Sequence, residues 1–382
     1  MPKINTSKGV IYLFIFISLS HPKINSQINF DKNTNLKKVG YFSKRDNDSL
    51  FHYARKLQKS KNPCNADFGI ITEAHAYYRV GDYFEAEKKL NSIILKIKAE
   101  ICHKRNRINA LNRLFWIKKH QNKYKEAYHY LLIADTLINT FKKDLYSYKI
   151  KSTFKSNKAL IKTELNLHNE SNNLLLEIIS DFEKNNIYKS QKLSNNFLLQ
   201  KASTFNMIGD NHLNLYDKHL DKKYIDSADI YYLKAHLESK KVVPKLESSD
   251  IYYSLRRVKL NMRRSKYNKS LNIINNLTDK NHNEVLKLHS SYFKAIIFEK
   301  TNQLDSSLHH SYNFVKLNKK QKNHIQLIKI HQIFSRVYST KKEIDSALKY
   351  SNLTIKNLKK IKDESNNVFI DVYQNEYNMA LK

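Results

Sequence analysis

The sequence predicts an all-α fold, on three observations. Glycine and proline are scarce, with 5 and 4 residues in a chain of 382. Many-stranded folds need many tight turns, and such turns rely on these two residues, so their scarcity favours long helices joined by short polar loops. Hydrophobic residues make up 41% and aromatic residues 12%, a content that suits a packed core rather than a disordered chain. Third, one short phrase recurs along the chain between amphipathic stretches.

The chain is strongly basic, with a formal net charge of +33. Such an excess invites binding to nucleic acid, but the basic residues are 57 lysines and only 11 arginines. Arginine is the residue of choice for bidentate recognition of phosphates and bases. The lysines are spread along the whole chain, which is typical of a solvated surface. The composition therefore disfavours nucleic acid as a partner, and binding of a polyanion or glycan through net charge stays as an alternative.

Residues 1–20 are predicted to be a signal peptide. Two lysines precede an apolar stretch over residues 10–19, which is too short to span a membrane comfortably but fits the core of an export signal. Small residues allow cleavage after Ser20, or as late as Ser26. The chain is therefore expected to be exported, to the periplasm or the outside of the cell. An uncleaved signal would be its link to a membrane.

Three further segments follow the predicted signal. Residues 27–48 are expected to be a polar leader, and residues 49–365 carry the helical repeats. Residues 366–382 have an amphipathic helical pattern, with apolar side chains spaced three to four residues apart. We expect this last segment to form either a capping helix or the start of a further repeat.

The recurring phrase consists of a polar pair, a tyrosine or large aliphatic residue, two polar residues and a small residue. It reads Gly-Asp-Tyr-Phe-Glu-Ala over residues 81–86 and Asn-Lys-Tyr-Lys-Glu-Ala over residues 122–127. The polar pair suits a turn between antiparallel helices, acidic residues suit the first turn of the next helix, and the small residue suits a close crossing of the two helices. The predicted crossing residues are Ala86, Ala127, Asn172, Ala228, Ser270, Ser307 and Ala347.

This phrase resembles the turn of the tetratricopeptide repeat (TPR), which commonly reads Gly-Asp-Tyr-x-Glu-Ala. The resemblance implies a right-handed superhelical solenoid of about seven TPR-like helical hairpins with capping helices. Two features depart from the usual repeat. The crossing residues lie 37–56 residues apart rather than about 34, and the proline that usually follows the second helix is missing. The longest interval predicts an inserted loop near residues 217–223.

Long, lysine-rich repeats behind a signal peptide are similar to exported TPR proteins of Bacteroidota. In many of those proteins the repeats form the sensory region of a histidine kinase or a LuxR-type regulator. The resemblance therefore implies either a free-standing, non-catalytic scaffold for protein–protein interaction or the sensory region of a truncated transmembrane signalling protein.

The two cysteines are predicted to form a disulfide. Cys64 lies just before the first helix of the first repeat, and Cys102 lies just after its second helix. Because the two helices are antiparallel, both cysteines are expected at the same end of one hairpin. An exported protein permits the bond, and two free thiols stay as the alternative. A zinc site is disfavoured, since His103 is adjacent but no Cys-x-x-Cys spacing occurs.

The sequence offers no recognisable catalytic motif. The five glycines are far apart, whereas phosphate-binding and dinucleotide-binding loops need glycines close together. Neither His-Glu-x-x-His nor Gly-x-Ser-x-Gly occurs. We therefore expect no enzyme activity, no catalytic residue, no nucleotide or other cofactor and no metal.

In the TPR family the first helix of each hairpin lines the inner groove, so the resemblance implies a partner-binding surface there. The predicted groove residues are His75, Tyr78, Arg79, Trp116, Lys119, His120, Tyr252, Lys259, Arg263, Tyr292, Lys300 and Arg336. Aromatic rings supply contact area and arginines anchor carboxylates with directional hydrogen bonds. We therefore expect a protein or peptide ligand that is acidic or bears carboxylates. The alternative is that several of these aromatic side chains pack between repeats.

Overall fold

The computed structural model is all-α over the residues that it describes, and those residues contain no strand. The predicted signal peptide and the predicted capping segment 366–382 lie outside the described residues. Among the helices described, none combines the length and the apolarity that crossing a bilayer requires. The structure describes residues 34–42, 46–96, 100–121, 123–141, 145–184, 195–243, 247–280, 284–321 and 324–358.

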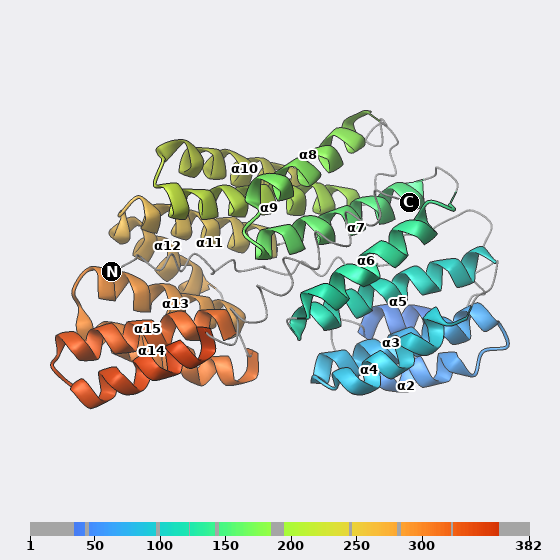
Figure 1. Cartoon of the computed structure of the whole chain (residues 1–382), viewed down its shortest axis with the longest axis horizontal. Coiled ribbons are helices and arrows are strands. Elements are labelled where there is room, and N and C mark those ends of the chain that lie inside the picture. Colours follow the sequence, from blue (N-terminus) through green and yellow to red (C-terminus); the bar gives the residue numbers. More distant parts are fainter. Residues whose placement is uncertain are drawn as a thin grey trace. The chain divides into compact units, whose positions relative to one another are not determined.

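The chain divides into two compact units, which are taken separately below. The N-terminal unit contains the described residues 34–161, and the C-terminal unit contains residues 162–181 and 195–358. Helices of the N-terminal unit are α1 (Thr34–Phe42), α2 (Asn47–Gln58), α3 (Pro63–Val80), α4 (Tyr83–Ile94), α5 (Ile101–His120), α6 (Tyr124–Ile138) and most of α7 (Leu145–Glu164) (Figure 1).

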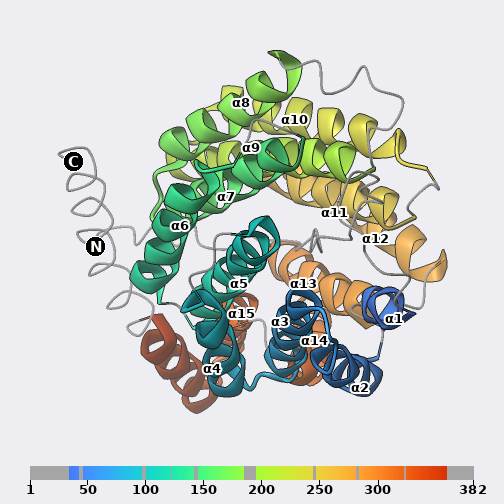
Figure 2. The same ribbon diagram turned by 90° about the vertical axis from the view of Figure 1, so that its right-hand side faces the viewer.

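The C-terminal unit continues the same alternation of helices (Figure 2). Its helices are α8 (His168–Lys184), α9 (Asn195–His219), α10 (Lys222–Lys240), α11 (Glu247–Arg263), α12 (Tyr267–Lys280), α13 (Glu284–Lys300), α14 (Leu304–Gln321), α15 (His324–Thr340) and the helical residues 344–358.

Successive helices pair as hairpins within each unit. In the N-terminal unit α3 packs on α4 and α5 on α6, and in the C-terminal unit α9 packs on α10, α11 on α12 and α13 on α14. Phe334 of α15 stacks on Tyr350 of helix 344–358 with ring centroids 4.5 Å apart. A short turn after Glu164 joins α7 to α8. The described residues thus form the predicted hairpins, and we call the first helix of each hairpin its A helix.

The turns inside the hairpins share one geometry. In the first hairpin the N–H of Asp82 donates to the carbonyl of Tyr77 at 3.0 Å, which is the long bond of a Schellman cap. Gly81 between them has a φ of 84°, in the left-handed region that favours glycine. Four other hairpins place a non-glycine residue there. These residues are Asn166, Ser265, Asn302 and Lys342, with φ between 56° and 64°.

The loop predicted near residues 217–223 is wrong. Helix α9 continues to His219 and α10 begins at Lys222, so only two residues separate them. Leu220 makes the turn with a φ of 57°. Much of the extra length of this repeat is helical, because α9 has 25 residues and α10 has 19. A longer amphipathic helix keeps its backbone hydrogen bonds and buries more surface than an inserted loop would.

Small residues lie at the helix crossings, as the recurring phrase predicts. Ala86 and Ala127 are fully buried. The hydroxyl of Ser270 donates to the carbonyl of Val258 at 3.2 Å, and the hydroxyl of Ser307 donates to that of Ala295 at 2.9 Å. Each serine hydroxyl is therefore hydrogen-bonded to the facing A helix, which allows the serine to be buried.

The crossing residue of the third hairpin is misassigned by one position. The N–H of Ser171 donates to the carbonyl of Leu167, four residues back, as the N–H of Ala86 does to Asp82. Ser171 is fully buried, whereas Asn172 retains 7% exposure. The crossing therefore uses Ser171 rather than Asn172, because only a short side chain fits where two helices approach closely.

The predicted polar leader, residues 27–48, contains helix α1. Val39 of α1 is 3% exposed and belongs to a cluster with Leu50 and Leu57 of α2. Helix α2 begins inside the predicted leader, where the side chain of Asp46 accepts from the N–H of Ser49 at 2.7 Å. The polar composition of this segment did not indicate these helices, because a short helix needs only one apolar face to pack against its neighbours.

Helices α9 and α10 approach closely at Gly209. A Cβ atom added to Gly209 would lie 2.6 Å from two ring atoms of Tyr232 and 3.3 Å from the carbonyl oxygen of Ala228. The side chain of Tyr232 is fully buried, and its hydroxyl donates to Asp210 at 2.7 Å. This crossing therefore sets the position of a charged residue on the A helix α9.

Candidate ligand-binding face

The predicted groove residues all lie on A helices. Those of the first two repeats lie on α3 and α5, in the N-terminal unit, and the others lie on α11, α13 and α15, in the C-terminal unit. Their surroundings differ between the two units.

In the N-terminal unit, aromatic and histidine side chains of α3 and α5 contact each other. Tyr78 Oη lies 2.9 Å from Nδ1 of His120, and the same nitrogen lies 2.8 Å from the carbonyl oxygen of Trp116. The ring of His75 stacks on that of Tyr78 at 6.0 Å, and Lys119 Nζ lies 6.0 Å from the centroid of the Trp116 ring. The contact between Tyr78 and His120 thus joins the neighbouring A helices α3 and α5.

Burial governs the electrostatics of this cluster. It lowers the pKa of His120, and the charge of Lys119 lowers it further. Burial also raises the pKa of Tyr78 well above its usual value. Arg79 is more exposed and donates to the carbonyl of Phe42 at 3.5 Å, which ties it to helix α1. The cluster is therefore neutral at its centre.

In the C-terminal unit, two of the predicted arginines form bidentate ion pairs. Arg263 of α11 donates to Asp217 of α9 through Nε at 3.0 Å and Nη2 at 2.7 Å. Arg336 of α15 donates to both carboxylate oxygens of Glu299 of α13. Each pair joins two neighbouring A helices. The planar fork of each guanidinium is thus already matched to a carboxylate.

Asp210 is the centre of a second, less balanced group. Besides the hydroxyl of Tyr232, two cations of α11 approach its carboxylate. Arg256 Nη2 lies 3.8 Å from Oδ2, and Lys259 Nζ lies 3.7 Å from Oδ1. Arg256 and Lys259 are each 8% exposed. One buried carboxylate therefore faces two buried cations at distances longer than a normal hydrogen bond.

Further polar side chains lie near this group. Asn214 follows Asp210 by one helical turn on α9 and is 7% exposed. His289 of α13 is 6% exposed, and burial together with the charge of Lys259 lowers its pKa to about 4. The pKa of Lys259 falls to about 8, chiefly through burial, with Arg256 among the neighbouring charges that lower it. The lowered pKa values of Lys259 and His289 thus come chiefly from burial.

Three more residues complete this face. Burial raises the pKa of Tyr292 to about 12. Lys329 of α15 has a lowered pKa, because it is buried and lies near Arg336 and Arg263. Tyr252 is half-buried, and Lys300 is exposed at the last turn of α13. The structure thus brings Lys259, Arg263, Tyr292 and Arg336 near other charged or polar side chains and leaves Lys300 at the edge.

Sequence analysis missed several residues of this face. Asp210, Asn214 and Asp217 lie on one face of α9, at positions i, i+4 and i+7. Arg256, Lys259 and Arg263 likewise share one face of α11, at positions i, i+3 and i+7. Such spacing can be recognised in a sequence. The unusually long interval between the crossing residues around α9, however, obscured which residues of this helix share a face.

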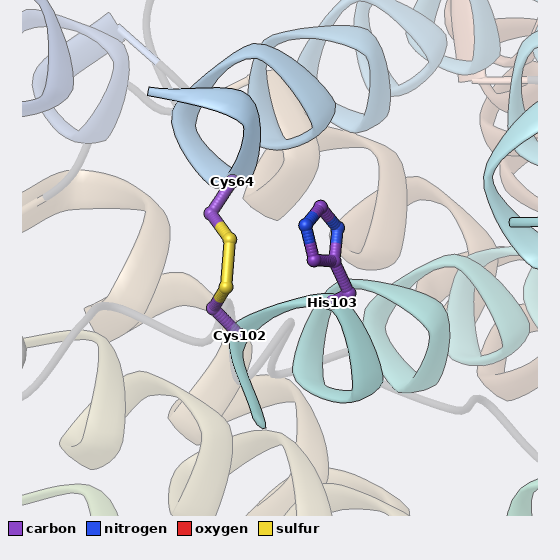
Figure 3. Close-up of side chains that lie close together, drawn as sticks. All are labelled: Cys64, Cys102 and His103. Carbon is purple, nitrogen blue, oxygen red and sulfur yellow. A yellow bond between two sulfur atoms is a disulfide. The ribbon is translucent and has the colours of Figure 1, made fainter. Parts of the chain in front are cut away.

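Cys64 and Cys102 are joined by a disulfide in the structure, with their Cα atoms 6.0 Å apart (Figure 3). Cys64 lies in the first turn of α3 and Cys102 in the first turn of α5. The bond thus links the A helices of two successive hairpins. The side-chain amide of Asn106 donates to the carbonyl of Cys64 at 2.9 Å and adds a second link.

His103 lies beside this disulfide (Figure 3). Its Nδ1 lies 2.8 Å from Asp67 Oδ2, and its Nε2 lies 3.0 Å from Glu100 Oε2. Lys96 donates to the other oxygen of Asp67 at 2.6 Å. The two sulfurs and the imidazole are close enough to share a metal ion. Here, however, the sulfurs are bonded to each other and both ring nitrogens face carboxylates.

No known protein family matches the sequence, and no curated protein shows significant similarity to it. Among solved structures, the fold is similar to the crystal structure of a Rap protein complexed with Competence and Sporulation Factor, with a TM-score of 0.56 and 10% sequence identity. The match covers 86% of this chain and 97% of the Rap chain. At this identity the likeness concerns the fold, and it confirms an all-α solenoid of TPR-like helical hairpins.

Proposed function

We propose that this chain is a non-catalytic scaffold that binds a segment of a protein or peptide on the A helices of its C-terminal unit. The observation that carries the proposal is the row of charged side chains on α9, α11, α13 and α15. Asp210, Arg256 and Lys259 of this row are buried, and a solenoid that served only as a spacer would gain more stability from apolar residues at those three positions. Support also comes from the similar Rap structure, which is complexed with a factor.

The ligand is proposed to be acidic. Five cations on this face, Arg256, Lys259, Arg263, Lys329 and Arg336, exceed the three carboxylates of Asp210, Asp217 and Glu299 that lie near them. This excess of positive charge lies next to Lys259 and Lys329, whose pKa values are lowered chiefly by burial and further by neighbouring arginines. A negatively charged segment would offset it.

Export is proposed from the N-terminal sequence, whose positive start and short apolar stretch over residues 10–19 fit a signal peptide. The working location is then the periplasm or the outside of the cell, as in the Bacteroidota TPR proteins that the repeats resemble. The alternative role as the sensory region of a signalling protein would use the same binding face.

The test is capture of partners from an envelope extract by the purified chain, washed at low and at high salt. The comparison variant carries Lys300→Glu and Lys329→Glu, one change on each of the A helices α13 and α15 of the C-terminal unit. The control variant carries Lys88→Glu and Lys349→Glu, at two exposed lysines on other helices. Circular dichroism first establishes that all three proteins are equally helical.

A protein that survives high salt, is lost by the first variant and is kept by the control supports the proposed scaffold. Anionic polymers that moderate salt releases equally from all three proteins would contradict it. That result would assign binding to net charge and favour the polyanion alternative, since counterion release makes such binding steeply salt-dependent.

A further inference from the structure

Among the buried side-chain atoms that have no hydrogen-bond partner within the described residues, three belong to side chains around Asp210 and Lys259, on the A helices of the C-terminal unit. They are Nδ2 of Asn214, Nε of Arg256 and Nδ1 of His289. Each belongs to a side chain that is less than 9% exposed. Buried polar groups are normally hydrogen-bonded, and exceptions point to strain or to a missing partner. Three exceptions on one face point to a shared partner.

The charges near these donors are also incomplete. Arg256 and Lys259 share the single carboxylate of Asp210, and Tyr232 already donates to one of its oxygens at 2.7 Å. Buried cations without a matched anion are costly. Two cations and one carboxylate leave one positive charge, which a single monoanion balances.

Arg264, in the turn that directly follows α11, shows what a satisfied guanidinium looks like here. It donates through Nη1 to Asp229 at 2.8 Å and through Nη2 to Asp226 at 2.9 Å. Among the described residues, Arg256 of α11 has only the longer contact with Asp210, at 3.8 Å. The difference lies in the carboxylates that face the two arginines.

We propose that Asn214, Arg256, Lys259 and His289 form a binding site for one carboxylate group of a ligand. The guanidinium fork suits the two oxygens of a carboxylate, Lys259 adds a point charge, and the amide and imidazole add neutral donors. The inference deepens the proposed function, on which it rests only in assigning the carboxylate to an acidic peptide segment. A doubly charged phosphate would exceed the single charge available.

The experiment titrates acetate into the purified, ¹⁵N-labelled chain and follows the arginine Nε–H signals, with sodium chloride at equal ionic strength as reference. The 11 arginines of the chain give few signals in this region. We expect acetate to shift one signal saturably, and that signal to be missing in Arg256→Gln. In Lys259→Met, acetate affinity measured through the Arg256 signal should fall at least about tenfold, and in Arg256→Gln no arginine signal should shift saturably.

Two further variants separate binding from mere stability. Arg264→Gln, directly after the end of α11 and outside the site, should keep acetate affinity within about twofold. Asp210→Asn removes the carboxylate that competes for the two cations while its amide oxygen still accepts from Tyr232. It should therefore tighten acetate binding several-fold. A cluster with only a structural role would lose order in Asp210→Asn and would not bind more tightly.

The proposal is overturned if chloride reproduces the shift of the arginine signal, or if Arg256→Gln and Arg264→Gln lose acetate binding equally. It is also overturned if Asp210→Asn binds acetate more weakly, or if inorganic phosphate binds more than about tenfold tighter than acetate. These outcomes are independent of the capture experiment. Saturable acetate binding without any captured protein would refute the scaffold function and leave the carboxylate site standing. A captured protein without acetate binding would refute the carboxylate site and leave the scaffold function standing.

Discussion

Replacement of Gly209 by alanine tests whether the α9–α10 crossing is as tight as the structure shows. The new Cβ would lie 2.6 Å from the Cδ1 and Cε1 atoms of Tyr232, well inside normal carbon–carbon contact. Tyr232 is fully buried and its hydroxyl is held by Asp210. The ring must therefore shift against packed neighbours.

The magnitude follows from three terms. Overpacking of a core costs about 1–3 kcal/mol, and loss of a hydrogen bond to a charged group costs about 1.5–3 kcal/mol. The higher helix propensity of alanine returns about 1 kcal/mol. We expect Gly209→Ala to lower the free energy of unfolding by about 2–4 kcal/mol.

The assay is urea unfolding followed by far-UV circular dichroism, with amide exchange of α9 and α10 as a local readout, because repeat proteins respond near the altered repeat. Gly40→Ala is the matched control, since a Cβ at Gly40 of helix α1 meets nothing within 4 Å. It should be neutral or stabilising. In a Tyr232→Leu background, which opens space, the cost of Gly209→Ala should fall by more than half. A Gly209→Ala protein as stable as its parent would refute the tight crossing.

Three other changes have expected outcomes. Leu220→Gly should raise the free energy of unfolding by about 0.5–1 kcal/mol in urea titration, because Leu220 is exposed and has a φ of 57°, which costs an L-residue about 1–2 kcal/mol; a loss of stability would count against the strained turn. Reduction of the disulfide between Cys64 and Cys102, which lie 38 residues apart, should cost about 3–4 kcal/mol, and a Cys64→Ala, Cys102→Ala chain should show the same melting temperature with and without reductant. Burial lowers the pKa of His168 to about 4, and the charge of Lys218 also lowers it. The unfolded chain then binds more protons, so stability should fall as pH drops from about 6.5 towards about 4; His168→Gln should flatten this dependence, and an unchanged slope would contradict it.

Much of the fold is readable from the sequence because one phrase combines turn, helix start and crossing residue. The polar pair, the acidic first turn and the small residue act locally, so the hairpins of Ala86 and Ala127 are predicted well. The phrase does not predict contacts between residues that lie far apart along the chain. Asn172 was predicted in place of Ser171 because the two residues are adjacent and both polar, and only the start of helix α8 in the structure distinguishes their positions.

The candidate site is less predictable, for a physical reason. An arginine on an A helix can face either a ligand or a carboxylate of the next repeat. Arg263 and Arg336 were predicted to bind a partner, and the structure pairs them with Asp217 and Glu299. Arg256 was not predicted, although it lacks such a pair. The difference depends on which carboxylate lies opposite, and pairing between helices about 40 residues apart is not encoded in local spacing.

The position of the disulfide has a consequence for a chain under tension. Pulling on the two ends of the polypeptide loads the path from Cys64 directly to Cys102 and bypasses the residues between them. These include all of α4 and most of α3. With 37 residues bypassed, since the two cysteines lie 38 positions apart, the fully stretched chain is about 125 Å shorter than its residue count allows, at about 3.4 Å per residue. Helix α4 therefore bears no direct mechanical load, even when every repeat around it has been drawn out.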